Sequence, residues 1–316
     1  MGKKYLLALL LFILALPVLA QTYGNEWINY SQKYYRIQIS KDGIYRLDSA
    51  TLASSGIPVG NVPGGIDPRR LQIFGLGKEQ YIFIKGESDG QFNTGDTLEF
   101  YGHANDGTTD SALYHGAAGT PPNPYVSLFN DTAVYYLTWN SALNNHRMKN
   151  LSDTTFSAYT PNPFIYKEDI SAFRGDYFQG TTDYNNITDP EYLPMECMVC
   201  TTIFYGGSYT ASMNTDKPYT GPINPVYPKP RLRARVVTRS NDFAVNPDYE
   251  IQITYPGPST YTKYVDGYTT FILDTIVPAG SLVANNPVTL YSINPGPSAS
   301  SGDAAFAYVS IKYPHT

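Results

Sequence analysis

The sequence predicts an all-β protein: two antiparallel β-sandwich or β-barrel-like domains with one short helix. Short runs of branched and aromatic residues recur along the chain, each bounded by glycine, proline, asparagine or aspartate. The 29 tyrosines, 24 prolines and 26 glycines are typical of a turn-rich extracellular β protein, in which tyrosine rings pack on half-buried sheet positions. One stretch alone, residues 48–56, has the pattern of a helix.

The first twenty residues predict a signal peptide. Lys3 and Lys4 precede an apolar run that ends at Leu16, and small residues reach Ala20 before Gln21. The run is shorter than the ~20 residues that span a bilayer, and no cysteine follows the cleavage position to carry a lipid. We therefore expect export to the periplasm, the outer-membrane surface or the extracellular space, with no transmembrane segment after the signal is removed.

Residues 21–150 are expected to form the amino-terminal β domain. Residues 34–39 alternate in polarity, and Asp42-Gly43 predicts a hairpin turn into a second strand over 44–47. The helix over 48–56 has Asp48 or Ser49 as its cap and ends at Gly56. Three strands follow at 71–74, 81–84 and 97–101, and a further strand is predicted at 133–139.

Residues 151–230 read as a loop-rich connecting region, with short strand candidates at 164–166 and 202–205. Residues 231–316 are expected to form a carboxy-terminal β-sandwich domain. Its predicted strands start at Leu232 and cover 249–255, 270–273, 288–291 and 305–313.

The stretch from Asp67 to Gly102 carries a resemblance to a known family. A strand that ends in QIFG, followed by the run DGQFNTGDTLEFYG from Asp89 to Gly102, resembles the amino-terminal β-region of gingipain-family cysteine peptidases. That family includes the PorU-type sortase of the type IX secretion system of Bacteroidetes. The resemblance implies that the catalytic caspase-like domain, with its histidine and cysteine, lies beyond Thr316. It also implies that the partners are that peptidase domain or components of the secretion system.

Charge excludes some partners. The formal net charge is −5 and only 16% of residues are charged, so nothing in the composition favours nucleic acid or an anionic membrane. The two cysteines, Cys197 and Cys200, form a C-x-x-C pair without the strand–helix context of a redox motif. A local disulfide and two unreactive thiols are the open alternatives.

Two further candidate sites are polar. The acidic loop, which we define as Glu87 to Asp96, offers oxygen ligands for calcium from Glu87, Asp89, Asn93 and Asp96. Its alternative is a hairpin loop whose carboxylates bond its own amides, in which case the protein has no cofactor.

The arginine row of Arg231, Arg233, Arg235 and Arg239 is the second candidate, for binding a carboxylate-bearing partner. Arg231, Arg233 and Arg235 alternate with apolar residues, so one face of this strand is basic. The alternative is cross-strand pairing of these arginines with Glu250.

No catalytic site is expected within these residues. Neither the cysteines nor the histidines at 103, 115, 146 and 315 lie in a recognisable nucleophile context. The resemblance therefore implies a non-catalytic β-region that acts in folding, docking or substrate presentation for a gingipain-like or sortase-like peptidase. The alternative is a free-standing secreted or surface protein that binds glycans or proteins, and an enzyme with an unrecognised acidic site is a third hypothesis.

Overall fold

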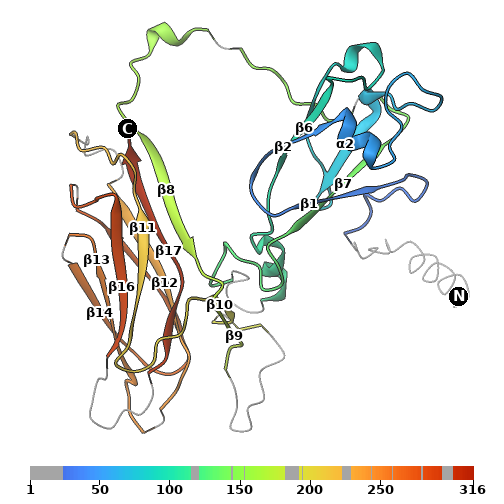
Figure 1. Ribbon diagram of the computed structural model, residues 1–316. Helices are drawn as coiled ribbons and strands as arrows, with labels where there is room; N and C mark the ends of the chain where they lie inside the picture. Colours follow the sequence, from blue (N-terminus) through green and yellow to red (C-terminus); the bar gives the residue numbers. More distant parts are fainter. Residues whose placement is uncertain are drawn as a thin grey trace, which may run out of the picture. The chain divides into compact units, whose positions relative to one another are not determined.

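The computed structural model describes residues 24–114, 121–143, 145–152, 154–181, 192–193, 195–222, 229–242, 244–257, 259–278, 280–293 and 302–316. It is built almost entirely of antiparallel strands (Figure 1), which confirms the all-β prediction. The expected signal peptide, residues 1–20, lies outside the described residues. In the part of the chain that is described, no helix is both long and apolar enough to cross a bilayer.

The chain divides into two compact units. Unit 1 comprises residues 1–103 and 133–150, and unit 2 comprises residues 104–132 and 151–316. Unit 1 contains a four-stranded sheet, β1-β7-β3-β4, and a three-stranded sheet, β2-β6-β5. Its elements are β1 (Tyr35–Ile39), β2 (Gly43–Asp48), α2 (Ser49–Ser54), η1 (Pro68–Arg70), β3 (Leu71–Gly75), β4 (Lys78–Glu79), β5 (Ile82–Lys85), η2 (Glu87–Asp89), β6 (Thr97–Gly102) and β7 (Ala133–Trp139).

One apolar core joins the two sheets of unit 1. Ile73 and Leu137 enter it from the first sheet, and Ile82 and Phe100 enter it from the second. The predicted helix is confirmed as α2: the Asp48 carboxylate accepts a hydrogen bond from the Thr51 amide at 2.8 Å. This bond satisfies one of the free amides at the start of the helix and lowers the pKa of Asp48.

The predicted hairpin between the first two strands is wrong. β1 pairs with β7, and β2 pairs with β6, so Asp42-Gly43 carries the chain from one sheet to the other. Gly43 has φ 158°, which is nearly extended backbone and not the left-handed turn that a tight hairpin requires. The local turn signal was present, but the partners of both strands come from much later in the sequence.

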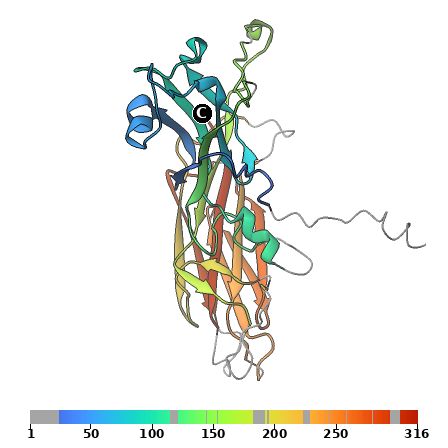
Figure 2. The same ribbon diagram turned by 90° about the vertical axis from the view of Figure 1, so that its right-hand side faces the viewer.

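Unit 2 is a sandwich of two four-stranded antiparallel sheets, β15-β12-β17-β8 and β11-β16-β13-β14, with a small β10-β9 pair. The long strands of the two sheets lie along one axis and alternate in direction (Figure 2). Its elements are η3 (Thr108–Leu113), η4 (Phe156–Ala158), β8 (Ile165–Ala172), β9 (Asp176–Phe178), β10 (Cys197–Val199), β11 (Ser208–Asn214), β12 (Arg231–Thr238), β13 (Tyr249–Tyr255), β14 (Ser259–Val265), β15 (Thr270–Ile276), β16 (Asn285–Ile293) and β17 (Ala304–His315).

The core of unit 2 lies between its two sheets. Leu232 and Val309 from one sheet and Ile251 and Leu290 from the other are all fully buried there. The strand β17 is the most buried element: every residue from Ala304 to Ile311 is buried, and Lys312 is its single exposed residue.

The domain boundaries differ from those predicted. Residues 151–230 are not a connector: they supply β8 and β11, one strand to each sheet of the sandwich, as well as the β10-β9 pair. The expected strand at 202–205 is reduced to a single bridge between Ile203 and Ala304. Residues 104–132, predicted to belong to the first domain, are part of unit 2.

Asn123 fastens residues 104–132 to the sandwich. Its side chain is 1% exposed, and its amide nitrogen donates to the carbonyl oxygens of Phe173, Met198 and Ala307 at 3.2, 3.0 and 2.8 Å. These carbonyls lie just after β8, in β10 and in β17. One buried amide therefore links three separate parts of unit 2 to residues 104–132, which we call the inserted segment.

Candidate functional site

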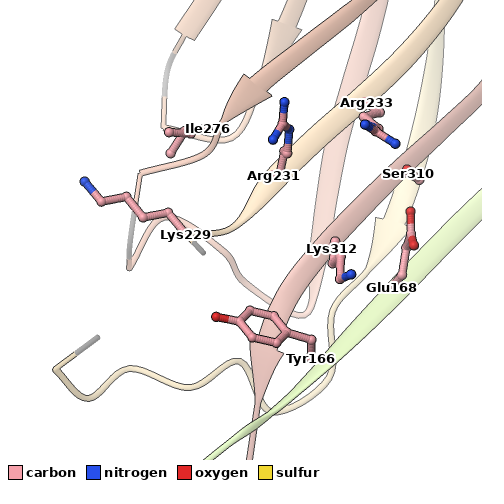
Figure 3. A pocket seen from close by; sticks show the side chains of 8 residues that line it. All are labelled: Tyr166, Glu168, Lys229, Arg231, Arg233, Ile276, Ser310 and Lys312. Atoms are coloured by element: carbon pink, nitrogen blue, oxygen red, sulfur yellow. The ribbon is translucent and has the colours of Figure 1, made fainter. Parts of the chain in front are cut away.

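A groove of about 470 Å³ lies on the outer face of the β15-β12-β17-β8 sheet (Figure 3). We call it the basic groove. Side chains alternate across a strand, so residues whose neighbours are buried in the core point outward together. Its lining comes from all four strands and from the segment before β12: Tyr166, Glu168, Lys229, Arg231, Arg233, Ile276, Ser310 and Lys312.

One carboxylate holds two of the guanidinium groups. Asp274, on β15, accepts hydrogen bonds from Nε of Arg231 and from Nε of Arg233, the latter at 3.1 Å. The Arg231 bond, supported by Arg233, holds the pKa of Asp274 below its usual range, so this carboxylate is ionised at neutral pH. Because Asp274 occupies both Nε atoms, it orients the two guanidinium groups, and both arginines line the groove.

The groove has an excess of positive charge. Arg231 lies directly opposite Lys312 in the register of β12 and β17, which sets two like charges side by side. Lys229 adds a further cation, and the acids at this face are Asp274 and Glu168, the latter opposite Lys312 on β8. Four basic side chains thus meet two carboxylates, in a chain whose formal net charge is −5.

Apolar side chains border the cations. Ile276 is 57% exposed and lies opposite Arg231 on β15. The ring of Tyr166 lies 5.9 Å from the Lys312 ammonium, and the buried Ser310 lies beside Arg233 between these walls. The groove therefore combines basic groups, which attract an anion, with two apolar contacts.

The inserted segment closes the other end of the same sheet face. Tyr125 packs edge-to-face on Tyr308, with ring centroids 5.1 Å apart. Tyr308, Ser310 and Lys312 share one face of β17, so the segment covers the Tyr308 end and leaves the Lys312 end open.

The structure divides the predicted arginine row. Arg231 and Arg233 line the groove, whereas Arg235 and Arg239 do not. Arg235 is half-buried, with a long 3.5 Å contact from Nη1 to the Thr270 hydroxyl. Arg239 contacts the Thr202 hydroxyl and the Phe178 ring, after a bulge in β12 at Arg235/Val236 changes the register with β17.

The expected pairing with Glu250 is wrong, because Glu250 lies on β13 in the opposite sheet. The acid that pairs with Arg231 and Arg233 is Asp274, the fifth residue of β15. Sequence reasoning also missed Lys229, Lys312 and Tyr166. The sequence did carry a signal for Lys312, because it is the one charged residue in the mostly apolar run 305–313.

The acidic loop bonds to itself and to one arginine. Asp89 accepts from the Gln91 amide and from the Asn93 side chain, and Asp96 accepts from the Asn93 backbone amide at 2.6 Å. Glu87 pairs with Arg147 at 2.9 Å. Across the described residues, no group of three or more His, Cys, Asp or Glu side chains is placed to hold a metal ion. Calcium in this loop stays a prediction.

Gly86 is essential to the shape of this loop. It has φ 89°, and a Cβ added there would lie 1.8 Å from Oδ1 of Asp96. Only glycine gives the left-handed backbone and the space for that carboxylate.

The two cysteines are buried free thiols, 1% exposed each, so the disulfide alternative is not what the structure shows. They lie in and just after β10, among the apolar side chains of the unit 2 core. Burial raises the pKa of Cys197 far above its usual range and that of Cys200 to about 12. Both shifts favour the protonated thiol over the nucleophilic thiolate at neutral pH.

The described histidines contact other groups. Nδ1 of His103 lies 2.8 Å from Asp42, the ring of His146 stacks on Tyr81 at 4.7 Å, and Nε2 of His315 lies 3.3 Å from Asp216. Asp216 also accepts from Lys167 and Tyr313, and these bonds hold its pKa well below the usual range. His115 lies outside the described residues.

Comparison with known proteins gives no family. No family model matches the chain, and no curated protein matches it. Among solved structures, BuGH86 in complex with neoagarooctaose is 10% identical with a TM-score of 0.24; the match covers 90% of this chain and 32% of that one. The chain therefore spans about a third of the length of BuGH86.

Two other solved structures are similarly distant. The ANX1 ectodomain from Arabidopsis thaliana is 10% identical with a TM-score of 0.24, and the match covers 90% of this chain and 81% of that one. The structure of the infectious bursal disease virus Gx strain is 8% identical with a TM-score of 0.26, covering 90% and 74% respectively. At these TM-scores the likenesses carry no argument about function.

Proposed function

We propose that this chain is an exported, non-catalytic docking module that binds a carboxylate-bearing partner in the basic groove. The resemblance of the stretch from Asp67 to Gly102 supports the further proposal that it is the amino-terminal β-region of a gingipain-like or sortase-like cysteine peptidase of the type IX secretion system. Its role there would be docking or substrate presentation. The observation that carries the proposal is the groove itself: four basic side chains, two of them oriented by Asp274, on an open sheet face.

The state of the thiols supports a binding role over a catalytic one. A cysteine peptidase needs a thiolate beside a histidine that accepts its proton. Here the charged groups that act on Cys197 are Arg235, Glu196 and Arg239, and burial keeps its thiol protonated. Docking needs none of this chemistry, because it depends only on complementary charge and shape.

A binding assay tests the proposal. We expect fluorescent poly-L-glutamate to bind the intact chain in 20 mM salt, and Arg231→Glu together with Lys312→Glu to abolish that binding. Lys85→Glu is the matched control, because Lys85 is an exposed strand lysine of unit 1. Equal binding by the double variant and the wild type would overturn the proposed site. Peptide cleavage by the purified chain that Cys197→Ser removed would overturn the non-catalytic role.

A free-standing glycan- or protein-binding role is the second candidate, favoured by an exposed row in unit 1. Ile44 pairs with Tyr101 across β2 and β6, and Tyr81 immediately precedes β5, whose Ile82 pairs with Phe100. The side chains of Ile44, Tyr101 and Tyr81 are 63%, 49% and 60% exposed. Exposed aromatic rings in a row can stack on sugar rings or on apolar side chains.

Tyrosine fluorescence distinguishes this second candidate. If neutral polysaccharides bind this row, their titration changes the fluorescence of the wild type and not that of a Tyr81→Ala, Tyr101→Ala variant. An unchanged wild-type signal over a panel of neutral and acidic polysaccharides removes the glycan hypothesis.

A further inference from the structure

The spacing of the cations identifies the kind of partner that the basic groove fits. Arg231 and Arg233 are alternate residues of β12, so their Cα atoms lie about 6.8 Å apart along the strand. An extended peptide repeats its side chains on one face at the same interval. We infer that the groove binds an extended peptide segment with carboxylates at alternate positions, lying along β12. This inference rests on the proposed docking function and narrows it to one partner chemistry.

The first carboxylate has a defined place. Arg231 and Lys312 are direct cross-strand partners on β12 and β17, with side chains that leave the sheet about 5 Å apart. A carboxylate between them accepts from both and offsets the repulsion of the two cations. Lys229, two residues before Arg231, also lines the groove and adds to its positive charge.

The second carboxylate meets a different pair. Arg233 lies opposite Ser310, whose hydroxyl is buried beside it in the sheet face. The guanidinium and the hydroxyl both donate, so one carboxylate oxygen pair can accept from the two together. Asp274 already holds Nε of Arg231 and Nε of Arg233, which preorganises both guanidinium groups at the peptide repeat before a ligand arrives.

Apolar side chains border the basic row on both sides. Ile276 on β15 and Tyr166 on β8 both line the groove. An extended peptide that faces its acids toward the sheet turns the intervening side chains to solvent, so Ile276 and Tyr166 are placed to contact the methylene groups of the bound glutamates. An acidic polysaccharide has no flexible aliphatic arm to lay against Ile276, which is why we infer a peptide.

Two peptides of equal composition test the inference on the intact chain. The first alternates glutamate with valine, in the form Val-Glu-Val-Glu-Val-Glu-Val, and the second carries the three glutamates as one block; each bears a fluorescein label. Fluorescence anisotropy in 20 mM and in 150 mM salt gives the affinities. We expect the alternating peptide to bind at least fivefold more tightly than the block peptide. Lys312→Ala and Arg233→Ala should each weaken it about fivefold to tenfold, whereas Lys85→Ala should not change it.

The outcomes separate the two proposals. Equal affinities for the two peptides, both weakened by Lys312→Ala, would overturn the alternating-peptide inference and leave the docking function standing. Absence of binding by either peptide and by poly-L-glutamate would overturn both. Alginate, a polyuronate, is the third ligand. Binding of alginate more tightly than of the alternating peptide, with the same loss in Lys312→Ala, would assign the groove to polysaccharide and overturn the peptide inference.

Discussion

Replacing Asn123 tests how the chain is divided between its two units. The residue belongs to the inserted segment 104–132, yet its side-chain amide donates to carbonyl oxygens of Phe173, Met198 and Ala307 in unit 2. Asn123→Ala removes these bonds without adding charge. We expect it to destabilise unit 2 and to leave unit 1 unchanged.

The size of the effect follows from the contacts. The amide group has two hydrogens, which serve three carbonyls at 2.8 to 3.2 Å, so about two hydrogen bonds are lost. Each is worth about 1 kcal/mol, and carbonyls left buried without a donor raise the cost. Ala307 keeps a second donor, the Phe173 amide at 3.2 Å, which limits that penalty. The free energy of unfolding of unit 2 should therefore fall by about 2–4 kcal/mol.

The chain carries separate probes for its two units. Both tryptophans, Trp27 and Trp139, belong to unit 1, and both cysteines belong to unit 2. Tryptophan fluorescence in urea therefore follows unit 1, and the reaction of the buried thiols with a chromogenic disulfide follows unit 2. With a urea dependence of about 2 kcal/mol per molar, the thiol midpoint should fall by about 1–2 M.

The urea midpoint of tryptophan fluorescence tests whether the segment belongs to unit 2 alone. If Asn123→Ala lowers it as much as the thiol midpoint, the segment does not belong to unit 2 alone and the reasoning fails. Asn130→Ala, an exposed position in the same segment, is the control and should cost at most about 1 kcal/mol. Asn123→Asp should be worse than alanine at neutral pH, because a carboxylate would face three carbonyl oxygens, and it should recover as acid protonates it.

Three further predictions concern charged side chains. Asp248 is 1% exposed, and burial, with the neighbouring Asp266, raises its pKa. The folded state therefore holds the proton more tightly than the unfolded state. As a result, wild-type stability falls as pH rises from about 4 through the raised pKa. The Asp248→Asn variant cannot ionise at this position, so its stability does not fall in this way. The difference between the urea midpoints of the variant and the wild type, followed by the thiols, should therefore grow between pH 4 and 7. A difference that stayed constant with pH would contradict this. Asp96→Ala should lower the stability of unit 1 by about 1 kcal/mol, because the Asn93 amide loses its acceptor; a calcium-induced rise in the wild-type tryptophan midpoint that Asp96→Ala abolishes would instead establish the metal site. Lys312→Ala should change the free energy of unfolding of unit 2, followed by the thiols, by less than about 0.5 kcal/mol while it weakens peptide binding, and a larger loss of stability would show that this lysine is structural.

The sequence was informative wherever one strand carried its own signal. β13 has the predicted bounds, and β7 and α2 fall where alternation and capping placed them. These signals are local, since period and cap chemistry involve residues within a few positions of one another. β14 was missed because its residues, STYTKYV, alternate weakly in polarity, and a single one of them, Val265, is buried.

Local sequence signals do not determine which strands pair with one another. Asp42-Gly43 has the sequence of a hairpin turn, but β1 pairs with β7, almost a hundred residues later, and β2 pairs with β6. The groove depends on pairing in the same way. Arg231 and Arg233 were visible as an alternating row, but Lys312, Tyr166 and Asp274 join them only through the register of four strands. Glu250 lies in the next predicted strand after the arginine row, and the sandwich places it in the opposite sheet.

The outer face of the β15-β12-β17-β8 sheet is covered at one end and open to solvent at the other. At the Tyr308 end, Tyr125 covers the face, and Asn123 fastens the covering segment. At the other end Lys312 is open to solvent, beside Arg231 and the exposed Ile276. A face that needed only to be solvated would gain from acids opposite its cations, since opposite charges across strands stabilise and like charges do not. The open end has two such pairs, Glu168 opposite Lys312 and Asp274 opposite Arg233, but Arg231 faces Lys312 and Lys229 adds a further cation, so an excess of positive charge remains for an anionic partner to offset.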